Sequence, residues 1–306
     1  VAALFLVSGT AVAQQPAGKD WSTYGGNMWN QRYSGLTAIT TKNVNQLVPR
    51  SIVQTGIPKQ GSFENTPIVI GSNAFITTPF NTIIAYNLDS KKEIWRYEHK
   101  LGTSIYCCGP NNRGAAVHGP HVYMGTLDSR LLAFESTTGK VVWDVEVADP
   151  TFGYSITHAP LIVGNNVIVG VSGGEYGIRG HVTAYDAVSG KQVWRWYSIP
   201  APKGDPTYDP TAPNGWWGEW VKSTPEGNSL NRDIAKEKGD SAKHADAWTR
   251  GGGGVWMTPA FDPESGTIYV AVGNPSPDLD GSQRPGDNLY TDAVVAIDAA
   301  SGKTKW

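Results

Sequence analysis

The residues best suited to chemistry in this chain are its two cysteines, Cys107 and Cys108, which are adjacent in the segment SIYCCGPNN. Neighbouring Cα atoms lie about 3.8 Å apart across a trans peptide, so a bridge between them would close a small, strained ring. Two free, buried thiols are the alternative. Export to an oxidising compartment would favour the bridge, because exposed thiols do not persist there. The bridged pair would offer a flat apolar surface on which a planar molecule could lie.

Glu175 and Asn274 are the second pair of interest, because they occupy matching positions in two similar segments. Each lies 15 residues after a proline, Pro160 or Pro259, that opens an apolar segment. Oxygen atoms presented side by side suit a hard cation such as Ca²⁺. Two glycines directly before Glu175 favour this interpretation, because glycine lets the backbone approach a ligand closely. The alternative is that Glu175 is a solvated loop acid and Asn274 a turn former.

The elements that must position these residues are sequence repeats. Each repeat has an apolar strand, a tight turn and a second strand that ends in tryptophan. The four copies are Ile83–Trp95, Leu131–Trp143, Val182–Trp194 and Val294–Trp306. Their tryptophans follow one another after 48, 51 and 112 residues. The first two spacings suit a four-stranded propeller blade, and insertions at about 198–250 and 275–290 explain the third. We expect these four tryptophans to pack between blades.

The composition agrees with an all-β fold. The chain of 306 residues has 36 Gly, 20 Pro, 12 Trp and 13 Tyr with 17% charged residues, which indicates many turns and strands. A net charge of −2 argues against a nucleic-acid partner. No run after the N-terminus approaches the roughly 20 apolar residues of a membrane span.

The N-terminal residues have the pattern of a secretion signal. A short apolar run, Val1–Val7, is followed by Ala11-Val12-Ala13 before Gln14, which is the small-residue pattern at which signal peptidase cuts. We therefore expect residues 1–13 to be a partial signal peptide and the mature protein to be periplasmic.

Several motifs, in order, resemble one family. They are Cys107-Cys108 with Arg113 five residues on, Ser172-Gly173-Gly174-Glu175, Gly251–Gly254 followed by Val255-Trp256, Gly273-Asn274-Pro275, and Arg284-Pro285-Gly286-Asp287-Asn288. From about Asp20 to Trp306 the chain resembles the pyrroloquinoline quinone (PQQ)-dependent alcohol dehydrogenases of the methanol and ethanol type. The resemblance implies an eight-bladed β-propeller with tryptophan-docking motifs. About four blades are countable here, so residues 14–306 are expected to be the N-terminal half of one propeller domain.

The resemblance also implies roles for individual residues. A Cys107–Cys108 disulfide would lie on one face of the quinone and Trp256 on the other, about 7–8 Å apart if each contact is about 3.5–4 Å. Glu175 and Asn274 would bind Ca²⁺ or a lanthanide, with their oxygens within about 5 Å of each other. One departure is Gly254, where several relatives carry a hydroxyl. The cofactor-binding residues implied are Glu64, Cys107, Cys108, Arg113, Thr157, Ser172, Gly173, Gly174 and Trp256.

The implied function is oxidation of a primary alcohol to an aldehyde by hydride transfer to metal-bound PQQ, with a cytochrome c as electron acceptor. A quinoprotein acting on sugars or polyols, and a non-catalytic propeller scaffold of the outer-membrane assembly type, are the alternatives. A homodimer or a small second subunit is compatible with the sequence. The general-base aspartate of the family is expected beyond Trp306, so no catalytic residue is assigned in this chain, which is expected to be inactive alone.

Two structural expectations follow from the count of four blades. The blades should form an open, crescent-like array, and a strand at Gln46–Gln54 should lack a sheet partner. For Trp216, Trp217 and Trp220, in the long insertion, two interpretations stay open. They either cap the channel or anchor the loop.

Overall fold

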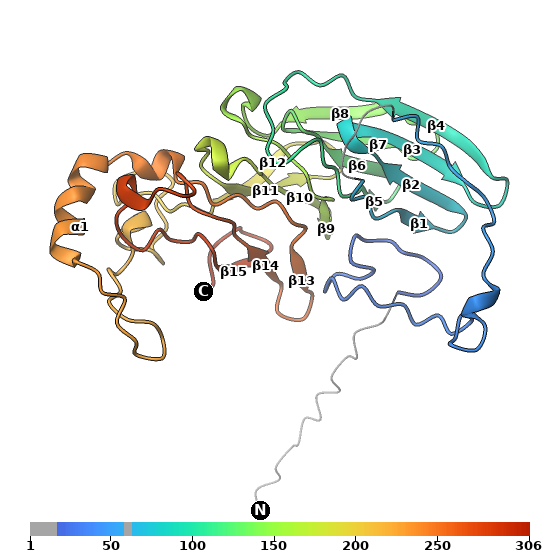
Figure 1. The fold of residues 1–306 in the computed structure, drawn as a ribbon. Helices are drawn as coiled ribbons and strands as arrows, with labels where there is room; N and C mark the ends of the chain where they lie inside the picture. The colour runs from blue at the N-terminus through green and yellow to red at the C-terminus, as the bar shows by residue number, and fades with distance from the viewer. Residues whose placement is uncertain (1–16, 58–62) are drawn as a thin grey trace, which may run out of the picture.

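Four antiparallel β-sheets stand side by side in the computed structural model, which describes residues 17–57 and 63–306 (Figure 1). The predicted signal peptide, residues 1–13, lies outside the described residues. In each sheet the strands follow one another in chain order. The first sheet contains β1 (Ile68–Ile70), β2 (Asn73–Thr77), β3 (Thr82–Asn87) and β4 (Lys92–Glu98). The second contains β5 (Ala116–His118), β6 (His121–Gly125), β7 (Arg130–Glu135) and β8 (Val141–Glu146). This architecture confirms the predicted propeller blades.

The third and fourth sheets continue the same pattern. The third contains β9 (Leu161–Val163), β10 (Asn166–Gly170), β11 (His181–Asp186) and β12 (Gln192–Tyr197). The fourth contains β13 (Ala260–Asp262), β14 (Thr267–Ala271) and β15 (Val294–Asp298). A single bridge between Ile297 and Thr304 brings the last residues alongside β15, where the fourth strand of a blade would run.

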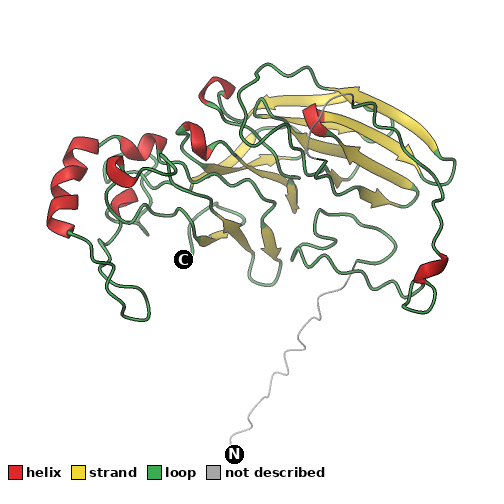
Figure 2. Cartoon of the chain, viewed as in Figure 1, coloured by secondary structure: helices red, strands yellow, loops and turns green. Residues whose placement is uncertain are grey.

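Helices gather in the long insertion between β12 and β13 (Figure 2). It holds α1 (Ile234–Ser241) and the 3₁₀ helices η5 (Gly215–Trp217), η6 (Ala242–His244) and η7 (Ala247–Arg250). Elsewhere the 3₁₀ helices are η1 (Val44–Gln46), η2 (Pro79–Asn81), η3 (Pro150–Phe152), η4 (Gly174–Tyr176) and η8 (Gly281–Gln283). Across residues 17–57 and 63–306, no helix has the length and apolar character needed to cross a membrane.

The repeat tryptophans join each sheet to the next. The indole nitrogens of Trp95, Trp143 and Trp194 donate to the carbonyls of Ser136, Ala187 and Ala299 at 2.8, 3.1 and 3.1 Å. Each acceptor lies in the outer hairpin turn of the following sheet. The predicted docking role of these three tryptophans is therefore confirmed. Trp306 is 66% exposed, with no following sheet among the described residues to receive it.

A glycine in each receiving turn makes the docking possible. Gly139, Gly190 and Gly302 have positive φ values of 72°, 69° and 69°. A Cβ on them would lie 2.6, 2.9 and 2.5 Å from the docked indole. These contacts explain why the second, third and fourth repeats carry glycine before the lysine of the turn, since any side chain would displace the tryptophan. The first repeat, whose turn receives no tryptophan among the described residues, has Lys91 at this position.

Apolar cores fill the spaces between neighbouring sheets. One cluster joins the first and second sheets around Phe75, Trp95 and Phe134, and another joins the second and third around Tyr123 and Ile156. A third cluster joins the third and fourth sheets. Because each sheet buries its faces only against its neighbours, the relative placement of the sheets depends on these layers.

The segment before the first sheet connects the two ends of the array. Trp21 forms an antiparallel bridge with Val69 of β1. The Met28 carbonyl accepts from the Phe261 N–H at 2.8 Å, and the Asn30 amide donates to the Thr258 carbonyl at 2.9 Å. The four sheets thus form an arc whose ends are linked by this segment rather than by direct strand pairing, in agreement with the predicted open array (Figure 1).

The strand predicted at Gln46–Gln54 is wrong. Residues 47–57 contain no strand or bridge, and Val48 and Ile52 are 81% and 84% exposed. A strand needs a neighbour to satisfy its backbone groups, and Pro49 lacks one donor in any case. The segment has no sheet partner, as expected, and without one it adopts an irregular extended course.

His158 gives the fold a specific sensitivity to acid. Its ring is fully buried beside β10, where Nε2 accepts from the Gly170 N–H at 2.8 Å and Nδ1 lies 2.8 Å from the Ala159 carbonyl. The neutral ring with hydrogen on Nδ1 satisfies both contacts, whereas a second ring proton would face the Gly170 donor. Burial accordingly lowers the pKa of His158 to about 4.

We expect the stabilisation from neutral His158 to be complete above about pH 6.5, the unfolded value, and to fall progressively toward pH 4. The loss over this interval should be about 3 kcal/mol. Urea unfolding at intervals from pH 7.5 to 4 measures it, and His158→Gln should flatten this part of the profile. His118→Gln, at a half-buried histidine, should leave the slope unchanged. If the free energy of unfolding falls as steeply with pH in His158→Gln as in the unmodified chain, other groups cause the acid lability.

Candidate functional site

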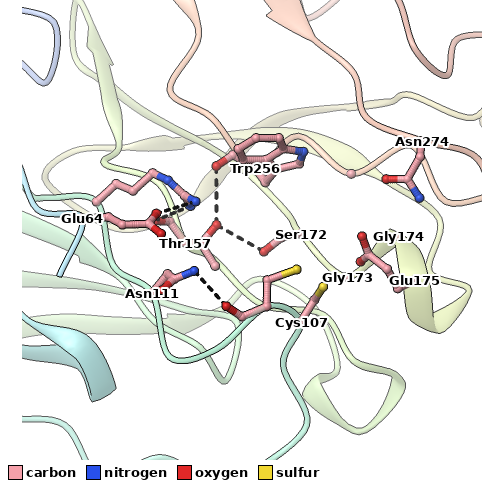
Figure 3. A pocket seen from close by; sticks show the side chains of 13 residues that line it. Glu64, Cys107, Asn111, Thr157, Ser172, Gly173, Gly174, Glu175, Trp256 and Asn274 are labelled. Carbon is pink, nitrogen blue, oxygen red and sulfur yellow. Dashed lines mark hydrogen bonds and ion pairs between the residues drawn. The ribbon is translucent and has the colours of Figure 1, made fainter. Parts of the chain in front are cut away.

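A cavity of about 340 Å³ at one end of the sheets brings together every residue predicted to bind cofactor or metal (Figure 3). Asn111 and Gly254 complete the lining. The placement agrees with the sequence analysis, while the binding role of each residue stays a prediction. The lining residues are Glu64, Cys107, Cys108, Asn111, Arg113, Thr157, Ser172, Gly173, Gly174, Glu175, Gly254, Trp256 and Asn274.

The antiparallel meander explains why such distant residues meet. The connection that enters the first strand of a sheet and the connection that leaves its second strand lie at the same end of that sheet. Arg113, Thr157 and Trp256 precede β5, β9 and β13, whereas Glu175 and Asn274 follow β10 and β14. Neighbouring sheets stand side by side, so these connections converge on one cavity.

Arg113 and Glu64 form the charged wall of the cavity. Their side chains make an ion pair of 2.6 Å, with 13% and 35% of each side chain exposed. The Arg113 N–H donates to the Thr157 carbonyl at 2.9 Å, and the Arg113 carbonyl accepts from Thr66 N–H at 3.0 Å. The Arg113 guanidinium also lies 5.2 Å from the Trp256 ring centre. A planar fork of donors held in this way is suited to a carboxylate ligand.

A ladder of hydroxyl groups continues from this wall. The Ser172 hydroxyl donates to the Ser155 carbonyl at 3.0 Å and lies 3.5 Å from the Thr157 hydroxyl. The Thr157 hydroxyl in turn lies 3.4 Å from the Trp256 carbonyl. Both lining hydroxyls are therefore fixed by neighbours, and their lone pairs remain available to a polar ligand at the edge of the cavity.

Trp256 and the cysteine pair bound the cavity from two sides, as Figure 3 shows. Trp256 is 45% exposed, although Val255 beside it is fully buried. The Val255 N–H donates to the Val171 carbonyl at 2.7 Å, which fixes the backbone that carries the indole. An anchored aromatic ring with an uncovered face is suited to stacking on a flat molecule.

Both cysteine thiols are free in the structure, so the predicted disulfide is not formed in it. The two sulfur atoms and a carboxylate oxygen of Glu175 all lie within 4.8 Å of one another. Burial, followed by contacts with Cys108 and Glu175, raises the pKa of the Cys107 thiol. The pair is thus close enough to interact with one ligand, and Cys107 is a protonated thiol at neutral pH.

A strained turn places Glu175. Gly173 has a φ of +116°, and a Cβ there would lie 2.2 Å from the Gly153 carbonyl oxygen. The short helix η4 begins at the next residue and carries Glu175. Only glycine satisfies both the backbone angle and the close approach, so the geometry of this turn explains the first glycine of the SGGE motif.

Asn274 lies beside the same turn. A Cβ on Gly174 would be 3.6 Å from the Asn274 amide nitrogen. The Asn274 carbonyl accepts from the Gly253 N–H at 2.8 Å, and its amide nitrogen donates to the Pro275 carbonyl at 3.2 Å. The amide oxygen is the atom left for a ligand. Glu175 and Asn274 therefore supply oxygens to the same end of the cavity, as a shared cation requires.

The sequence analysis missed Asn111 as a lining residue. Its amide nitrogen donates to the Cys108 carbonyl at 3.2 Å, while its buried Oδ1 has no hydrogen-bond partner. A buried acceptor without a partner indicates that a ligand or water supplies the donor. The signal was its place in the CCGPNN motif, three residues after Cys108.

The insertion supports the cavity from behind. Trp216 is 1% exposed and lies against Gly251, whose Cβ would be 3.0 Å from the indole. It packs with Ile199, Ala247 and Trp248. For Trp216 the loop-anchoring interpretation is therefore correct, because neither it nor Trp217 lines the cavity.

Comparisons with known proteins give a consistent result. Residues 21–225 and 231–306 match the family model described as "Glucose/ethanol/alcohol dehydrogenase, beta-propeller domain". The chain is 37% identical over 301 residues to quinohemoprotein alcohol dehydrogenase ADH IIB of Pseudomonas putida, covering 96% of this chain and 40% of that protein. It is 36% identical over 282 residues to a lanthanide-dependent methanol dehydrogenase of Methylorubrum extorquens, covering 90% of this chain and 44% of that protein.

Solved structures agree. A europium-containing methanol dehydrogenase superposes with a TM-score of 0.75 at 30% identity, covering 94% of this chain and 48% of that one. Quinohemoprotein alcohol dehydrogenase ADHIIG from Pseudomonas putida HK5 gives a TM-score of 0.75 at 33% identity, covering 94% and 39%. The chain spans less than half the length of the relatives it matches.

The turn at Gly173 can be tested by substitution. We expect Gly173→Ala to lower the free energy of unfolding by about 3 kcal/mol or more, because it combines a disfavoured φ with a clash against backbone. Gly164→Ala is the matched control, since Gly164 also has a positive φ of +57° but no atom within 4 Å of its Cβ position. The control should lose about 1 kcal/mol. Urea denaturation measures both, and equal losses would contradict the role assigned to the Gly153 contact.

Proposed function

Since the chain belongs to the glucose, ethanol and alcohol dehydrogenase β-propeller family, the PQQ-dependent alcohol dehydrogenases, we propose that its cavity binds PQQ together with Ca²⁺ or a lanthanide. The observation that carries the proposal is the convergence of an exposed indole face, two sulfurs, an arginine and two oxygen ligands on one cavity. When bound, PQQ supplies an acceptor for the hydride of an alcohol, and the cation supplies Lewis acidity at its oxygens.

The residues present fit a flat, polycarboxylate cofactor. Trp256 offers an uncovered ring on one side and the cysteine pair an apolar surface on the other. Arg113 presents a guanidinium at the edge, where a ligand carboxylate can compete with Glu64 or share the donors with it. Thr157, Ser172 and the unpartnered Asn111 oxygen supply further polar contacts around the rim.

Glu175 and Asn274 are proposed to hold the cation. Their carboxylate and amide oxygens are hard ligands of the kind that Ca²⁺ and trivalent lanthanides prefer. Residues 252 and 253 hold both loops, because the Gly252 N–H donates to the Ile178 carbonyl and the Gly253 N–H donates to the Asn274 carbonyl, each at 2.8 Å. A bound ion would therefore meet loops that are already ordered.

Among the described residues that line the cavity, the carboxylates are Glu64 and Glu175. Glu64 is paired with Arg113, and Glu175 is assigned to the cation. Neither is free to remove the alcohol proton, which supports the proposal that an aspartate outside these residues acts as the general base. We further propose that the protein works in the periplasm and passes electrons to a cytochrome c.

The binding proposal predicts one PQQ per chain in the presence of Ca²⁺ or La³⁺, measured by calorimetry. Glu175→Gln and Asn274→Ala should each weaken the metal-dependent affinity at least about tenfold, because each removes or weakens one ligand to the ion. Trp256→Ala should weaken PQQ binding with or without metal, since stacking does not require the ion. Trp220→Ala, outside the cavity, is the matched control. Unchanged affinity in both metal-ligand variants would refute the proposed ion site.

Activity is tested with the natural protein that carries this chain, loaded with PQQ and Ca²⁺ or a lanthanide. Primary alcohols are expected to reduce an artificial electron acceptor faster than glucose or polyols do. Faster reaction with sugars would replace the alcohol assignment with the sugar alternative. No reaction with any of these substrates, despite bound PQQ, would reject the dehydrogenase function while leaving the binding site intact.

A further inference from the structure

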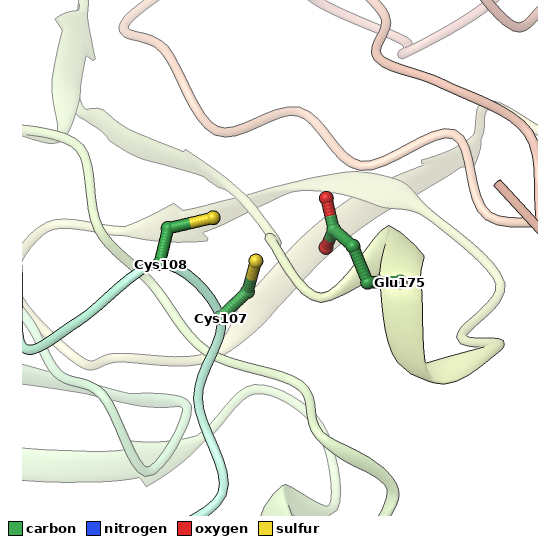
Figure 4. A group of neighbouring side chains, drawn as sticks. All are labelled: Cys107, Cys108 and Glu175. Atoms are coloured by element: carbon green, nitrogen blue, oxygen red, sulfur yellow. The ribbon is translucent and has the colours of Figure 1, made fainter. Parts of the chain in front are cut away.

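The two thiols and the Glu175 carboxylate form a cluster with its own chemistry (Figure 4). One ligand atom from each of Cys107, Cys108 and Glu175 lies within 4.8 Å of the other two. Cys107 lies in the connection between β4 and β5, whereas Glu175 lies in η4 after β10, so the cluster is a product of the fold and not only of adjacency. Its three potential ligands are two sulfurs and one oxygen.

This separation is near that of a metal site. In a tetrahedral zinc site with Zn–S bonds of about 2.3 Å and Zn–O bonds of about 2.1 Å, neighbouring ligand atoms lie about 3.5–3.8 Å apart. The observed separations, all within 4.8 Å, exceed these distances by at most about 1.3 Å. Thiolates select thiophilic ions, in contrast to the oxygen ligands that Ca²⁺ prefers. A fourth position would be open to water, because the cluster borders the cavity.

The backbone that carries the cluster is already ordered. The segment with both cysteines starts at His99, whose Nε2 lies 2.9 Å from the Asp128 carboxylate. It ends at Asn112, whose amide donates to the Gly125 carbonyl at 3.0 Å. Burial opposes ionisation of Asp128, but hydrogen bonds from His99, Thr126 and the backbone outweigh it and lower its pKa to about 2. The carboxylate anchor is therefore charged at neutral pH, and both ends of the segment that carries the cysteines are held by hydrogen bonds.

We propose that, in the dithiol form of the chain, Cys107, Cys108 and Glu175 bind one thiophilic divalent ion such as Zn²⁺. The ion forms two metal–sulfur bonds and one metal–oxygen bond, and the two thiol protons are released to solvent. The site requires neither PQQ nor the hard cation. It is therefore independent of the proposed dehydrogenase function, although it uses the same glutamate.

The shared glutamate makes the two metal sites mutually exclusive. A thiophilic ion on Glu175 would leave Asn274 as the remaining assigned ligand for Ca²⁺ or a lanthanide. Oxidation of the pair by a small disulfide, which accepts two electrons and two protons and leaves as two thiols, would join the sulfurs and remove both thiolate ligands. The redox state of Cys107 and Cys108 then decides whether soft metals can occupy the cavity.

The test is titration of the whole chain, without quinone, with Cd²⁺ after reduction by a phosphine. We expect one Cd²⁺ per chain, with an ultraviolet sulfur-to-metal charge-transfer band and displacement by Zn²⁺. Cys107→Ser and Cys108→Ser should each lose most of this band, and Glu175→Gln should bind Cd²⁺ at least about tenfold more weakly. The chain oxidised with glutathione disulfide should give no band.

Glu264→Gln, at an exposed acid in the β13–β14 turn, is the matched control and should bind as the unmodified chain does. Circular dichroism shows whether each variant has folded. Absence of the band in the reduced chain, one metal per two chains, or a band retained in both cysteine variants would overturn the proposal. Unchanged affinity in folded Glu175→Gln would overturn the three-ligand site. Because no quinone is added, none of these results bears on PQQ binding.

Discussion

The docking of each repeat tryptophan onto the turn of the next sheet is the interaction on which the rest of the structure depends. Trp95, Trp143 and Trp194 each combine one indole hydrogen bond with close contact to a glycine. A hydrogen bond fixes direction, and a ring packed against a bare backbone fixes distance. Together they set the spacing of neighbouring sheets at the outer rim. The apolar clusters between the sheets then fill a gap of defined width.

The cavity depends on that spacing because no single sheet could build it. Arg113 enters from the second sheet, Thr157 and Glu175 from the third, and Trp256 from the fourth. A change in the angle between two sheets would therefore shift these connections relative to one another and disrupt the cavity. The backbone bonds that cross between connections, such as Arg113 N–H to the Thr157 carbonyl and Val255 N–H to the Val171 carbonyl, hold this region in register. The tryptophan contacts at the outer rim and the backbone hydrogen bonds at the inner connections thus both restrain the angle between neighbouring sheets.

Structural features that recur in each sequence repeat could be predicted from the sequence. Trp95, Trp143 and Trp194 could be placed because the same hairpin pattern recurs with a blade-length period, and Glu175 and Asn274 because they occupy matching repeat positions. The rest of the predicted lining came from the resemblance to the PQQ-dependent alcohol dehydrogenases. Features without a repeat were harder. Asn111 has no counterpart in the other repeats. The segment Gln46–Gln54 was expected to be a strand without a sheet partner, but without that partner it does not form a strand. Pairing is a tertiary property, and a local pattern cannot supply the partner.

Arg179 connects the insertion to the site. Nothing in the sequence predicts this role except its place four residues after Glu175. It is buried, its Nε donates to the Ile199 carbonyl at 2.9 Å, and its guanidinium lies 3.8 Å from the Tyr197 ring centre and 4.6 Å from that of Trp248. Burial lowers its pKa to about 10, so it remains charged at neutral pH.

A buried cation without a carboxylate in hydrogen-bonding contact is costly, and two aromatic faces offset part of that cost. Those faces come from β12 and from the insertion, while the Arg179 backbone N–H donates to the Tyr154 hydroxyl at 2.9 Å. The arginine therefore joins the end of the Glu175 turn to the third sheet and to the insertion at one point. Because the Gly251–Trp256 connection also rests on Trp216, the insertion supports both the cation end and the indole wall of the cavity without contributing a side chain to its lining.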